Sequence, residues 1–524
     1  MLAPVFARLF FPPGHETAAL LGTVALYAAG FVVRPFGALF FGPMGDRAGR
    51  TYAFLVSSVF MGFSTFTIGL LPVFSQAGWL APALLLLLRV LQGLALGGVY
   101  GGVAATVAEY FPANRHGFAT SFVQTTATSG LLLALIAVAA CRTELSPSDF
   151  ERWGWRIPFL VSILFMALSI SIRAGLRETP VFLRMRAERR LSERPLVESF
   201  FRWPNNKYAV LALFGATAGQ AALWYTAHLY TLVFLTVTLR LDDLTSALLV
   251  AAAMALGMPF FIFFGWLSDK IGRLKIVVAG CLLAVASYFP LFQSLAGAVN
   301  PALIQFQAAN PVTLRADRAT CTIPLFAGSW QDFSLCNRVA DFLTGSGLRF
   351  MVQNTPGSQS VEVSIGTETI KISAAEKESV AALLERALFA AGYPGLSLKQ
   401  TSGGPQVDAR GAFVFERKTA DPALIDVPAA LGVLLALMLI ATMAYGPIAA
   451  LLVELFAANV RCTSLSLPYH IGNGVFGGLL PLIATATVAA TGNPYAGLVY
   501  PVSVAAITAV IGGLCFRRRP IHEP

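Results

Sequence analysis

Eleven long apolar stretches constrain this sequence more than any other feature. Each is close to the length of about 20 residues that a helix needs to cross a membrane. The stretches are 18–41, 53–73, 82–110, 118–140, 156–173, 209–235, 245–267, 275–296, 427–453, 464–490 and 495–516. Only 12% of the 524 residues are charged and 56% are hydrophobic, whereas a soluble domain carries about 25% charged residues. The sequence therefore predicts a polytopic membrane protein and excludes a soluble globular or a disordered chain.

Basic residues in the short loops predict which way the chain crosses the membrane. Lys and Arg in such loops mark the cytoplasmic side, and here they follow alternate stretches. These residues are Arg47, Arg50, Arg115, Arg173, Lys270, Arg273, Lys275, Arg461, Arg517, Arg518 and Arg519. We therefore expect a cytoplasmic C-terminus. The segment from Met1 to Pro13 is apolar but too short to cross, and it resembles the outer end of a truncated helix. A complete helix there would give twelve spans with both termini inside.

Two sequence motifs occur twice. Gly42-Pro-Met-Gly-Asp-Arg-Ala-Gly-Arg50 matches Gly265-Trp-Leu-Ser-Asp-Lys-Ile-Gly-Arg273, which lies 223 positions later. Ala108-Glu-Tyr-Phe-Pro-Ala-Asn114 matches Val453-Glu-Leu-Phe-Ala-Ala-Asn459, which lies 345 positions later. The chain therefore consists of two parallel repeats, and the second repeat contains an insertion.

The polar stretch 297–424 supplies the insertion, and by the order of the spans it lies outside the membrane. It carries eleven Lys or Arg and eleven Asp or Glu, so the net charge of +10 belongs to the membrane body. Nucleic-acid binding is not needed to explain that charge. Alternating residues predict a small α/β domain, with strands at 348–353, 360–365, 368–372 and 412–415 and a helix at 374–392. Its two cysteines, Cys321 and Cys336, would pair in an oxidising compartment, although two unpaired thiols are the alternative.

The predicted organisation has six parts. We expect a first helix bundle at 1–172, a basic cytoplasmic linker at 173–207, a second bundle at 208–296 and 425–516, the insert at 297–424 and a cytoplasmic tail at 517–524. The linker holds nine Lys or Arg against four Asp or Glu, which suits topology setting and contact with anionic lipid.

The repeated motif between the second and third helices of each half resembles the major facilitator superfamily. Several runs extend this to a closer resemblance, to the metabolite:proton symporter family. They are Arg34-Pro-Phe-Gly-Ala38, Leu91-Gln-Gly-Leu-Ala-Leu-Gly-Gly98, Trp153-Gly-Trp-Arg-Ile-Pro-Phe159, Glu178-Thr-Pro-Val-Phe182 and Ser466-Leu-Pro-Tyr-His-Ile-Gly-Asn473. The resemblance implies an all-α polytopic membrane protein of two parallel six-helix repeats, with the first helix truncated and a small α/β extracytoplasmic insert. It also implies proton-coupled symport by alternating access.

The sequence departs from the family pattern at two places. The acidic and aromatic cluster of the family's first helix is missing, and Val99 occupies the position where Glu usually follows the Gly-Gly pair. Because carboxylates inside membranes are the usual proton carriers, an uncoupled facilitator is an alternative.

Polar and aromatic residues within the spans are the candidate substrate ligands. Arg89 could meet a substrate carboxylate with its guanidinium, although pairing with another helix would also explain a buried Arg. Gln220, Trp224 and His228 recur every four residues and would share one helix face. His228 and His470 could replace a missing carboxylate as proton carriers. The predicted substrate-binding set is Arg89, Tyr100, Gln124, Gln220, Trp224, Tyr225, His228, Tyr445, Tyr469 and His470.

The repeated loops predict an inner gate whose charge pairs break and re-form as the two halves rock. The alternative is ordinary capping of helix ends. The predicted gating residues are Arg34, Asp46, Arg47, Arg50, Glu109, Asp269, Lys270, Arg273, Glu454 and Arg461.

The motifs of several other functions are missing from the sequence. It has no phosphate-binding loop, no spaced Cys and His metal site and no hydrolase elbow, so we expect neither ATP use, nor a metal or cofactor, nor enzymatic activity. The favoured function is proton-coupled symport of a small organic acid or zwitterion across the bacterial inner (plasma) membrane. The other alternative is a membrane receptor or assembly protein that acts through the outer insert.

Overall fold

A computed structural model describes residues 3–11, 23, 26–175, 178–321, 334–358, 360–373, 379–401, 404–407 and 413–515. Several sequence predictions fall partly outside the described residues. They are the ends of the segment 1–13, the start of the first span at 18–22, the start of the insert helix at 374–378, Ala412 and the basic residues 517–519.

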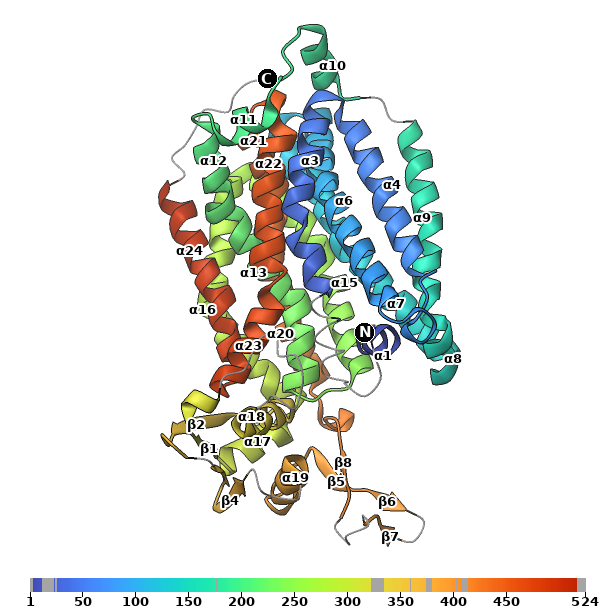
Figure 1. The fold of residues 1–524 in the computed structure, drawn as a ribbon. Helices are drawn as coiled ribbons and strands as arrows, with labels where there is room; N and C mark the ends of the chain where they lie inside the picture. The colour runs from blue at the N-terminus through green and yellow to red at the C-terminus, as the bar shows by residue number, and fades with distance from the viewer. Residues whose placement is uncertain are drawn as a thin grey trace.

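The predicted number of spans is confirmed, because the described residues contain eleven helices long and apolar enough to cross a membrane. Their bounds are Leu26–Arg47, Arg50–Ile68, Leu80–Tyr110, Ala113–Glu144, Gly154–Ile172, Asn205–Thr238, Asp243–Ile271, Arg273–Val299, Val427–Leu455, Ala458–Thr491 and Ala496–Cys515. The first five form one half of the bundle and the last six form the other half (Figure 1). The two repeated loops lie at one end, which we call the gate end, and the insert lies at the opposite end, which we call the insert end.

The first half contains α3 (Arg34–Arg47), α4 (Arg50–Ile68), α6 (Leu80–Tyr110), α7 (His116–Glu144) and α9 (Ile157–Ala174). The first span reaches further than the sequence predicts, since its helix continues past residue 41 through Pro43 to Arg47. The turn into α4 comes at Gly49, whose φ of 130° suits glycine. Most of the repeated motif is therefore helical.

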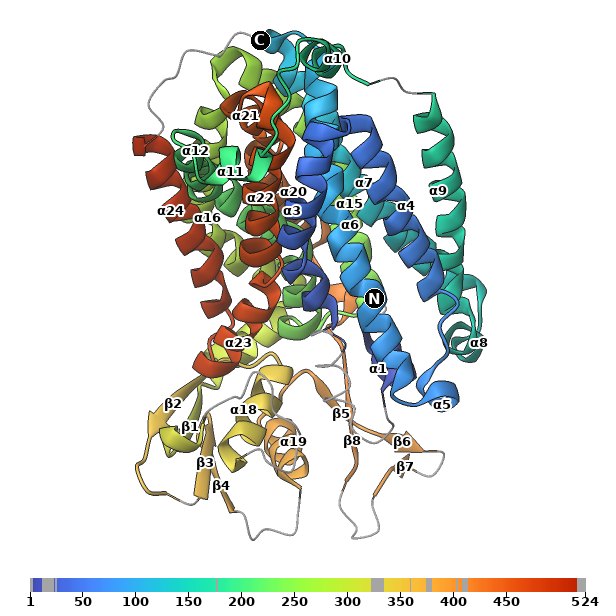
Figure 2. The ribbon, with the colours of Figure 1, turned by 45° about the horizontal axis from the view of Figure 1, so that its top comes forward.

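The apolar N-terminal segment forms α1 (Ala3–Phe10) at the insert end of the first half (Figure 2). Val5, Phe6 and Phe10 are buried there against Trp155 and Leu85. The guanidinium of Arg8 pairs with Glu151 of α8 (Pro147–Arg152), which ties the segment to the rim of the bundle.

The second half begins with α12 (Asn205–Ala212), α13 (Ala218–Tyr225) and α14 (Thr231–Val233), which are joined by π-helical turns at Leu213–Thr217, Thr226–Tyr230 and Phe234–Thr238. It continues with α15 (Asp243–Ile271), α16 (Arg273–Val299), α20 (Val427–Tyr445), α21 (Ile448–Leu455), α22 (Arg461–Ile471), α23 (Leu480–Thr491) and α24 (Val499–Cys515). A further π-helical turn, Gly472–Gly477, follows α22. Such turns often accompany functional sites because they rotate the side chains that follow.

The two halves meet along two helix pairs. Helix α3 of the first half packs against α22 of the second, and α7 packs against α15. In both pairs a repeated loop of one half lies against the start of a helix in the other half, as described below.

The insert is a small α/β domain, as predicted, and it contains a four-stranded sheet. Its sheet has the order β2-β1-β3-β4, with β1 (Val312–Ala316) parallel to β2 (Phe350–Asn354) and antiparallel to β3 (Ser360–Ile365), which pairs with β4 (Glu368–Ser373). Helices α18 (Leu335–Gly345) and α19 (Val380–Ala390) contact it. Short strands β5 (Leu396–Leu398), β6 (Gln400–Thr401), β7 (Gly404–Pro405) and β8 (Phe415–Arg417) form an arm that extends away from the sheet (Figure 2).

The predicted elements of the insert differ from the structure in detail. The predicted strands at 348–353, 360–365 and 368–372 correspond to β2, β3 and β4. The sequence analysis missed β1 and α18. Residues Cys321 and Cys336 form a disulfide that joins the segment after β1 to α18. Close to it, Asp317 accepts hydrogen bonds from the backbone N–H groups of Ala319 and Gly357, and these bonds lower the pKa of its carboxyl.

The insert is seated on the second half of the bundle. Helix α17 (Pro301–Ala309) continues from α16 and places Leu303 and Phe306 in the insert core. The backbone N–H of Phe350 donates to the carbonyl of Gly492, which precedes α24. The guanidinium of Arg240 donates to the carbonyl of Gly345 at 3.0 Å. We infer that the insert moves with the second half as one body.

Packing between α3 and α6 gives the first testable prediction. A Cβ atom added at Gly37 would lie 2.0 Å from the backbone oxygen of Leu94, whereas one added at Gly130 would meet nothing within 4 Å. We expect Gly37→Ala to lower the free energy of unfolding by about 1–3 kcal/mol, the usual cost of overpacking. Gly130→Ala is the control and should leave stability unchanged or slightly higher. Thermal unfolding in detergent measures both, and equal midpoints would contradict this packing.

Candidate functional site

The first polar centre at the gate end joins the loop of the first half to α22. The carboxylate of Asp46 accepts hydrogen bonds from the backbone N–H groups of Cys462 and Thr463 at 3.1 and 2.9 Å, and from the Thr463 hydroxyl at 2.7 Å. The first N–H groups of a helix have no partner within the helix and carry partial positive charge. Asp46 therefore caps a helix that belongs to the opposite half.

A buried carboxylate beside Asp46 binds two arginines. Glu109, at the end of α6, lies 2.9 Å from Arg50 and 2.9 Å from Arg461. The side chains of Glu109 and Arg50 are 2% and 0% exposed. The guanidinium of Arg50 also donates to the carbonyl of Ala458 in the other half, at 2.7 Å. We call Asp46, Arg50, Glu109 and Arg461 the first gate set.

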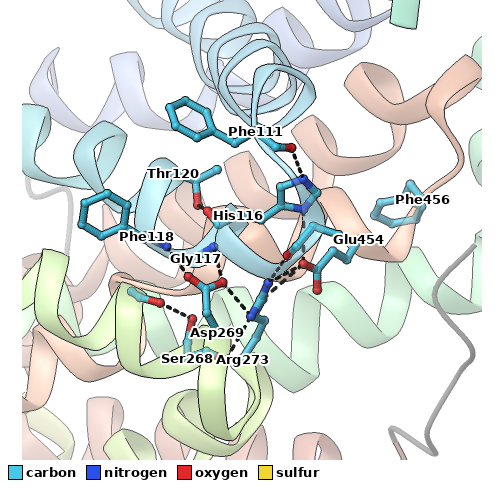
Figure 3. A network of polar contacts seen from close by, with 12 residues as sticks. Phe111, His116, Gly117, Phe118, Thr120, Ser268, Asp269, Arg273, Glu454 and Phe456 are labelled. Atoms are coloured by element: carbon cyan, nitrogen blue, oxygen red, sulfur yellow. Dashed lines mark hydrogen bonds and ion pairs between the residues drawn. The ribbon is translucent and has the colours of Figure 1, made fainter. Parts of the chain in front are cut away.

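The same arrangement occurs a second time with the halves exchanged (Figure 3). The carboxylate of Asp269 accepts the backbone N–H groups of Gly117 and Phe118, both at 2.8 Å, at the start of α7. Arg273 lies 2.9 Å from Asp269 and 2.7 Å from Glu454, and it donates to the carbonyl of Ala113 at 2.9 Å.

The fourth member of this second set is a histidine. Nδ1 of His116 lies 3.3 Å from Oε1 of Glu454, and Nε2 lies 3.1 Å from the carbonyl oxygen of Phe111. We call Asp269, Arg273, Glu454 and His116 the second gate set. Their positions follow from the internal repeat, since 223 residues separate Arg50 from Arg273 and 345 residues separate Glu109 from Glu454.

Two predicted gate residues lie beside these sets. The guanidinium of Arg47 is exposed and donates to the backbone carbonyl of Glu193 in the linker. The ammonium of Lys270 lies 3.9 Å above the centre of the Trp266 ring.

One polar contact next to the first gate set was not predicted from the sequence. The carboxylate of Glu178, which follows the first bundle, accepts the backbone N–H groups of Arg50, Thr51 and Tyr52 and so caps α4. His116 was missed as well, although the 345-residue repeat aligns it with Arg461 and could have found it.

Midway along the bundle, three tyrosines from both halves form an aromatic core. The rings of Tyr100 and Tyr469 are stacked 3.4 Å apart with an interplanar angle of 2°. The hydroxyls of Tyr469 and Tyr445 lie 2.7 Å apart, and the Gln124 amide donates to the Tyr100 hydroxyl at 2.8 Å. His470 is 2% exposed and lies beside Tyr100 and Tyr469.

A second group of polar side chains from α13 adjoins this core. The rings of Trp224 and His228 are stacked 4.3 Å apart, and Nδ1 of His228 bonds to the carbonyl of Trp224. The hydroxyl of Thr128 in the other half lies 3.4 Å from the remaining nitrogen of His228. Gln220 accepts a hydrogen bond from Asn473 at 3.4 Å.

Arg34 lies with these residues and away from the gate sets, although we expected it in the gate. Its guanidinium lies 3.3 Å from the Tyr225 hydroxyl and 4.0 Å above the Phe31 ring. The physical reason is the length of the first span. Since that helix runs on to Arg47, Arg34 lies 13 residues, or about 20 Å, from the end that carries the gate.

The structure places Arg89 elsewhere. Its guanidinium donates to Gln92 on its own helix at 3.2 Å and lies 4.8 Å from the centre of the Tyr27 ring. These contacts do not join it to the aromatic core. The polar and aromatic residues that do lie together form the central cluster: Arg34, Tyr100, Gln124, Gln220, Trp224, Tyr225, His228, Tyr445, Tyr469, His470 and Asn473.

The central cluster holds more hydrogen-bond donors than it uses. Nε of Arg34, Nε2 of Gln220 and Nε1 of Trp224 are buried and have no hydrogen-bond partner among the described residues. Buried polar groups are normally paired, so unpaired donors indicate a polar ligand. Donors, one of them cationic, suit a carboxylate. No group of three or more metal-ligating side chains occurs within the described part of the chain.

The fold and these motifs can now be compared with known proteins. The sequence model of the Major Facilitator Superfamily matches residues 10–308. This chain belongs to that superfamily. Among solved structures, the proton:xylose symporter XylE bound to 6-bromo-6-deoxy-D-glucose matches with a TM-score of 0.58 at 14% identity, over 97% of this chain and 89% of that one. A partially occluded inward-open structure of XylE from E. coli has a TM-score of 0.54 at 13% identity, over 97% and 91%.

The most informative relatives are bacterial metabolite transporters. The shikimate transporter of Escherichia coli (strain K12) is 34% identical over 298 residues, which are 56% of this chain and 67% of that protein. The alpha-ketoglutarate permease of the same organism is 34% identical over 296 residues, again 56% and 67%. The proline/betaine transporter of Salmonella typhimurium is 31% identical over 300 residues, 56% and 59%. The superfamily member described here is therefore similar to metabolite:proton symporters, as its motifs indicated. It is a multi-pass membrane transporter and not an enzyme.

The different burial of the two gate carboxylates gives the second prediction. Glu109→Gln removes the one carboxylate that both Arg50 and Arg461 bind, and breaking a buried pair costs about 3–5 kcal/mol. Glu454 is 23% exposed, so Glu454→Gln should cost less because water screens the remaining charges. We expect a larger loss of thermal stability in Glu109→Gln, together with faster alkylation of buried Cys462 behind the first gate set. Equal losses in both variants would contradict the difference in burial.

Proposed function

We propose that this transporter moves a small organic anion or zwitterion between its two halves by alternating access, coupled to protons. The observation that carries the proposal is the central cluster, where buried donors of Arg34 from the first half and of Gln220 and Trp224 from the second have no partner among the described residues. A carboxylate bound there would receive the guanidinium of Arg34 and neutral N–H donors. The Tyr100 and Tyr469 rings would contact the apolar part of the substrate.

The proposed orientation follows from the distribution of basic residues. The gate end would face the cytoplasm of a bacterial cell and the insert would lie outside the inner (plasma) membrane. The Cys321–Cys336 disulfide supports an oxidising environment for the insert. The C-terminus would then be cytoplasmic.

The polar contacts between the halves support an outward-facing or occluded state. Both gate sets join the halves at the gate end, while the contact of Thr128 with His228 lies near the middle of α7. Substrate would enter from the insert end. Release to the other side requires the pairs of Glu109 with Arg461 and Glu454 with His116 to break, because each joins the two halves.

His228 and His470 are the candidate proton carriers of the central cluster. Both are buried, and Val99 leaves no carboxylate at the position where the family's usual Glu would lie. An uncoupled facilitator therefore stays the main alternative. A receptor or assembly protein that acts through the insert is the second, since the insert is a folded domain with its own core.

Substitution of the two candidate arginines gives the third prediction. With radiolabelled shikimate, alpha-ketoglutarate, proline and betaine as probes in proteoliposomes, we expect saturable uptake of at least one. Arg34→Gln should raise KM about 10- to 100-fold, since a hydrogen bond to a charged group contributes about 1.5–3 kcal/mol. Arg34→Lys should lose less, and Arg89→Gln should change KM little because Arg89 lies outside the central cluster. The reverse order would support the sequence prediction for Arg89.

Collapse of the proton gradient gives the fourth prediction. A symporter accumulates substrate only while protons flow inward, so an ionophore that equalises pH and potential should abolish accumulation and leave exchange intact. If substrate does not accumulate even before the ionophore is added, while exchange is unchanged, the result would favour the facilitator. No flux of any probe through a folded protein would favour the receptor.

A further inference from the structure

We propose that the inner gate contains a proton-binding site at His116, which holds the gate closed when the imidazole is protonated and releases the gate when the proton leaves. The proposal concerns the regulation of alternating access. It goes beyond the proposed substrate and needs neither the substrate's identity nor proton coupling at the central cluster.

The first observation is that an acceptor lies close to each ring nitrogen of His116. Nε2 lies 3.1 Å from the carbonyl oxygen of Phe111, and Nδ1 lies 3.3 Å from Oε1 of Glu454 (Figure 3). The second contact is an ion-pair distance and not a hydrogen bond, since Nδ1 has no hydrogen-bond partner among the described residues. A carbonyl and a carboxylate accept hydrogen bonds and donate none. Only the imidazolium carries an N–H on both nitrogens, so only this form donates to Phe111 and at the same time presents a positive charge to Glu454.

The second observation is the charge of the equivalent group in the other half. The repeat aligns His116 with Arg461, 345 positions later, and Arg461 binds Glu109 as His116 binds Glu454. The first gate set contains two carboxylates and two permanent cations. The second gate set contains two carboxylates, Arg273 and His116. It reaches the same balance only when His116 carries a proton.

The charged groups that face His116 are consistent with this role. Arg273 of α16 binds the same oxygen of Glu454 at 2.7 Å, so this carboxylate already has a permanent cation beside it. Both oxygens of Asp269 are bound by the N–H groups of Gly117 and Phe118, and one also lies 2.9 Å from Arg273. Arg115 is exposed, and Lys270 lies over Trp266. Glu454 is thus the carboxylate that His116 meets directly.

The direction of the effect follows from where the two partners lie. His116 belongs to the first half and Glu454 to the second. Opening of the gate therefore separates them, and the imidazolium loses its ion pair with the carboxylate. The closed gate binds the proton and the open gate releases it to the solution at the gate end. A low pH on that side therefore favours the closed gate. As the pH rises, the ratio of closed to open molecules falls by at most tenfold per pH unit for one proton. In the proposed orientation, an acidified cytoplasm would slow inward release.

The test measures the gate directly, without substrate. Spin labels are placed at Tyr52→Cys on α4 and Val210→Cys on α12, which are exposed and lie at the gate end of opposite halves. Cys141, Cys281, Cys462 and Cys515 are replaced by serine, and the disulfide is kept. Electron-resonance distances are recorded in lipid nanodiscs from pH 5.5 to 8.5. We expect the short-distance population to fall as pH rises.

Three variants decide the origin of that change. His116→Arg should keep the short distance at every pH, and His116→Gln should give the longer distance at every pH, both without a pH step. Arg461→His makes the first gate set titratable too and should steepen the step. A step of unchanged size and midpoint in His116→Gln, or no step in the parent chain, would overturn the proposal.

A second route keeps the test valid if the His116 variants do not fold. Glu454→Gln removes the carboxylate that the imidazolium meets, so the step should vanish or move to lower pH, and an unchanged step would overturn the proposal. Failure of the proposed function is a separate result. A pH step at the gate with no flux of any probe would contradict the transport substrates and leave the proton site in place.

Discussion

The capping of a helix in one half by an aspartate from the other half is the interaction on which the rest of the gate depends. Asp46 caps α22 and Asp269 caps α7. Each carboxylate satisfies N–H groups that would otherwise lack partners, at the positive end of a helix. The motif glycines permit this approach, since a Cβ added at Gly265 would lie 2.6 Å from the carbonyl of Gly117. The two halves therefore meet through hydrogen bonds from backbone N–H groups of one half to a carboxylate of the other. The ion pairs of Glu109 and Glu454 form around these contacts.

The gate is coupled to the central cluster through the same helices. Helix α22 begins at Arg461 in the first gate set and carries Tyr469 and His470 about two turns further on. Helix α7 begins at His116 and carries Gln124 and Thr128. If each helix moves as a rigid rod over this length, a shift at either N-terminus would be transmitted to the side chains around the proposed substrate. The π-helical turn after α22 is the place where that helix can bend.

Hydropathy and the internal repeat predicted much of this structure, whereas the end of the first helix and the elements of the insert were harder to predict. The eleven spans follow from composition, because a bilayer leaves a chain few alternatives to long apolar helices. The second gate set could be read from the first by counting 223 and 345 residues. Arg34 was misassigned because its place along the membrane depends on where the first helix ends. Strand β1 was missed because a single short strand gives a weak periodic signal. Helix α18 has apolar residues at helical spacing, namely Cys336, Val339, Ala340 and Leu343, so its pattern could have been found.

The position of the insert adds a mechanical constraint to alternating access. It is bonded to the second half through Phe350 and Gly492 and through Arg240 and Gly345, and α16 continues into its core. In the proposed alternating access, rocking of the second half would therefore carry a folded domain through the solvent at the insert end. The first half ends there in α1 and α8, which are tied together by Arg8 and Glu151. The surfaces that would move at that end are thus the insert on one side and this small rim on the other. The gate end carries the helix termini, their charge pairs and the linker helices α10 (Pro180–Ala187) and α11 (Pro195–Phe200) (Figure 1).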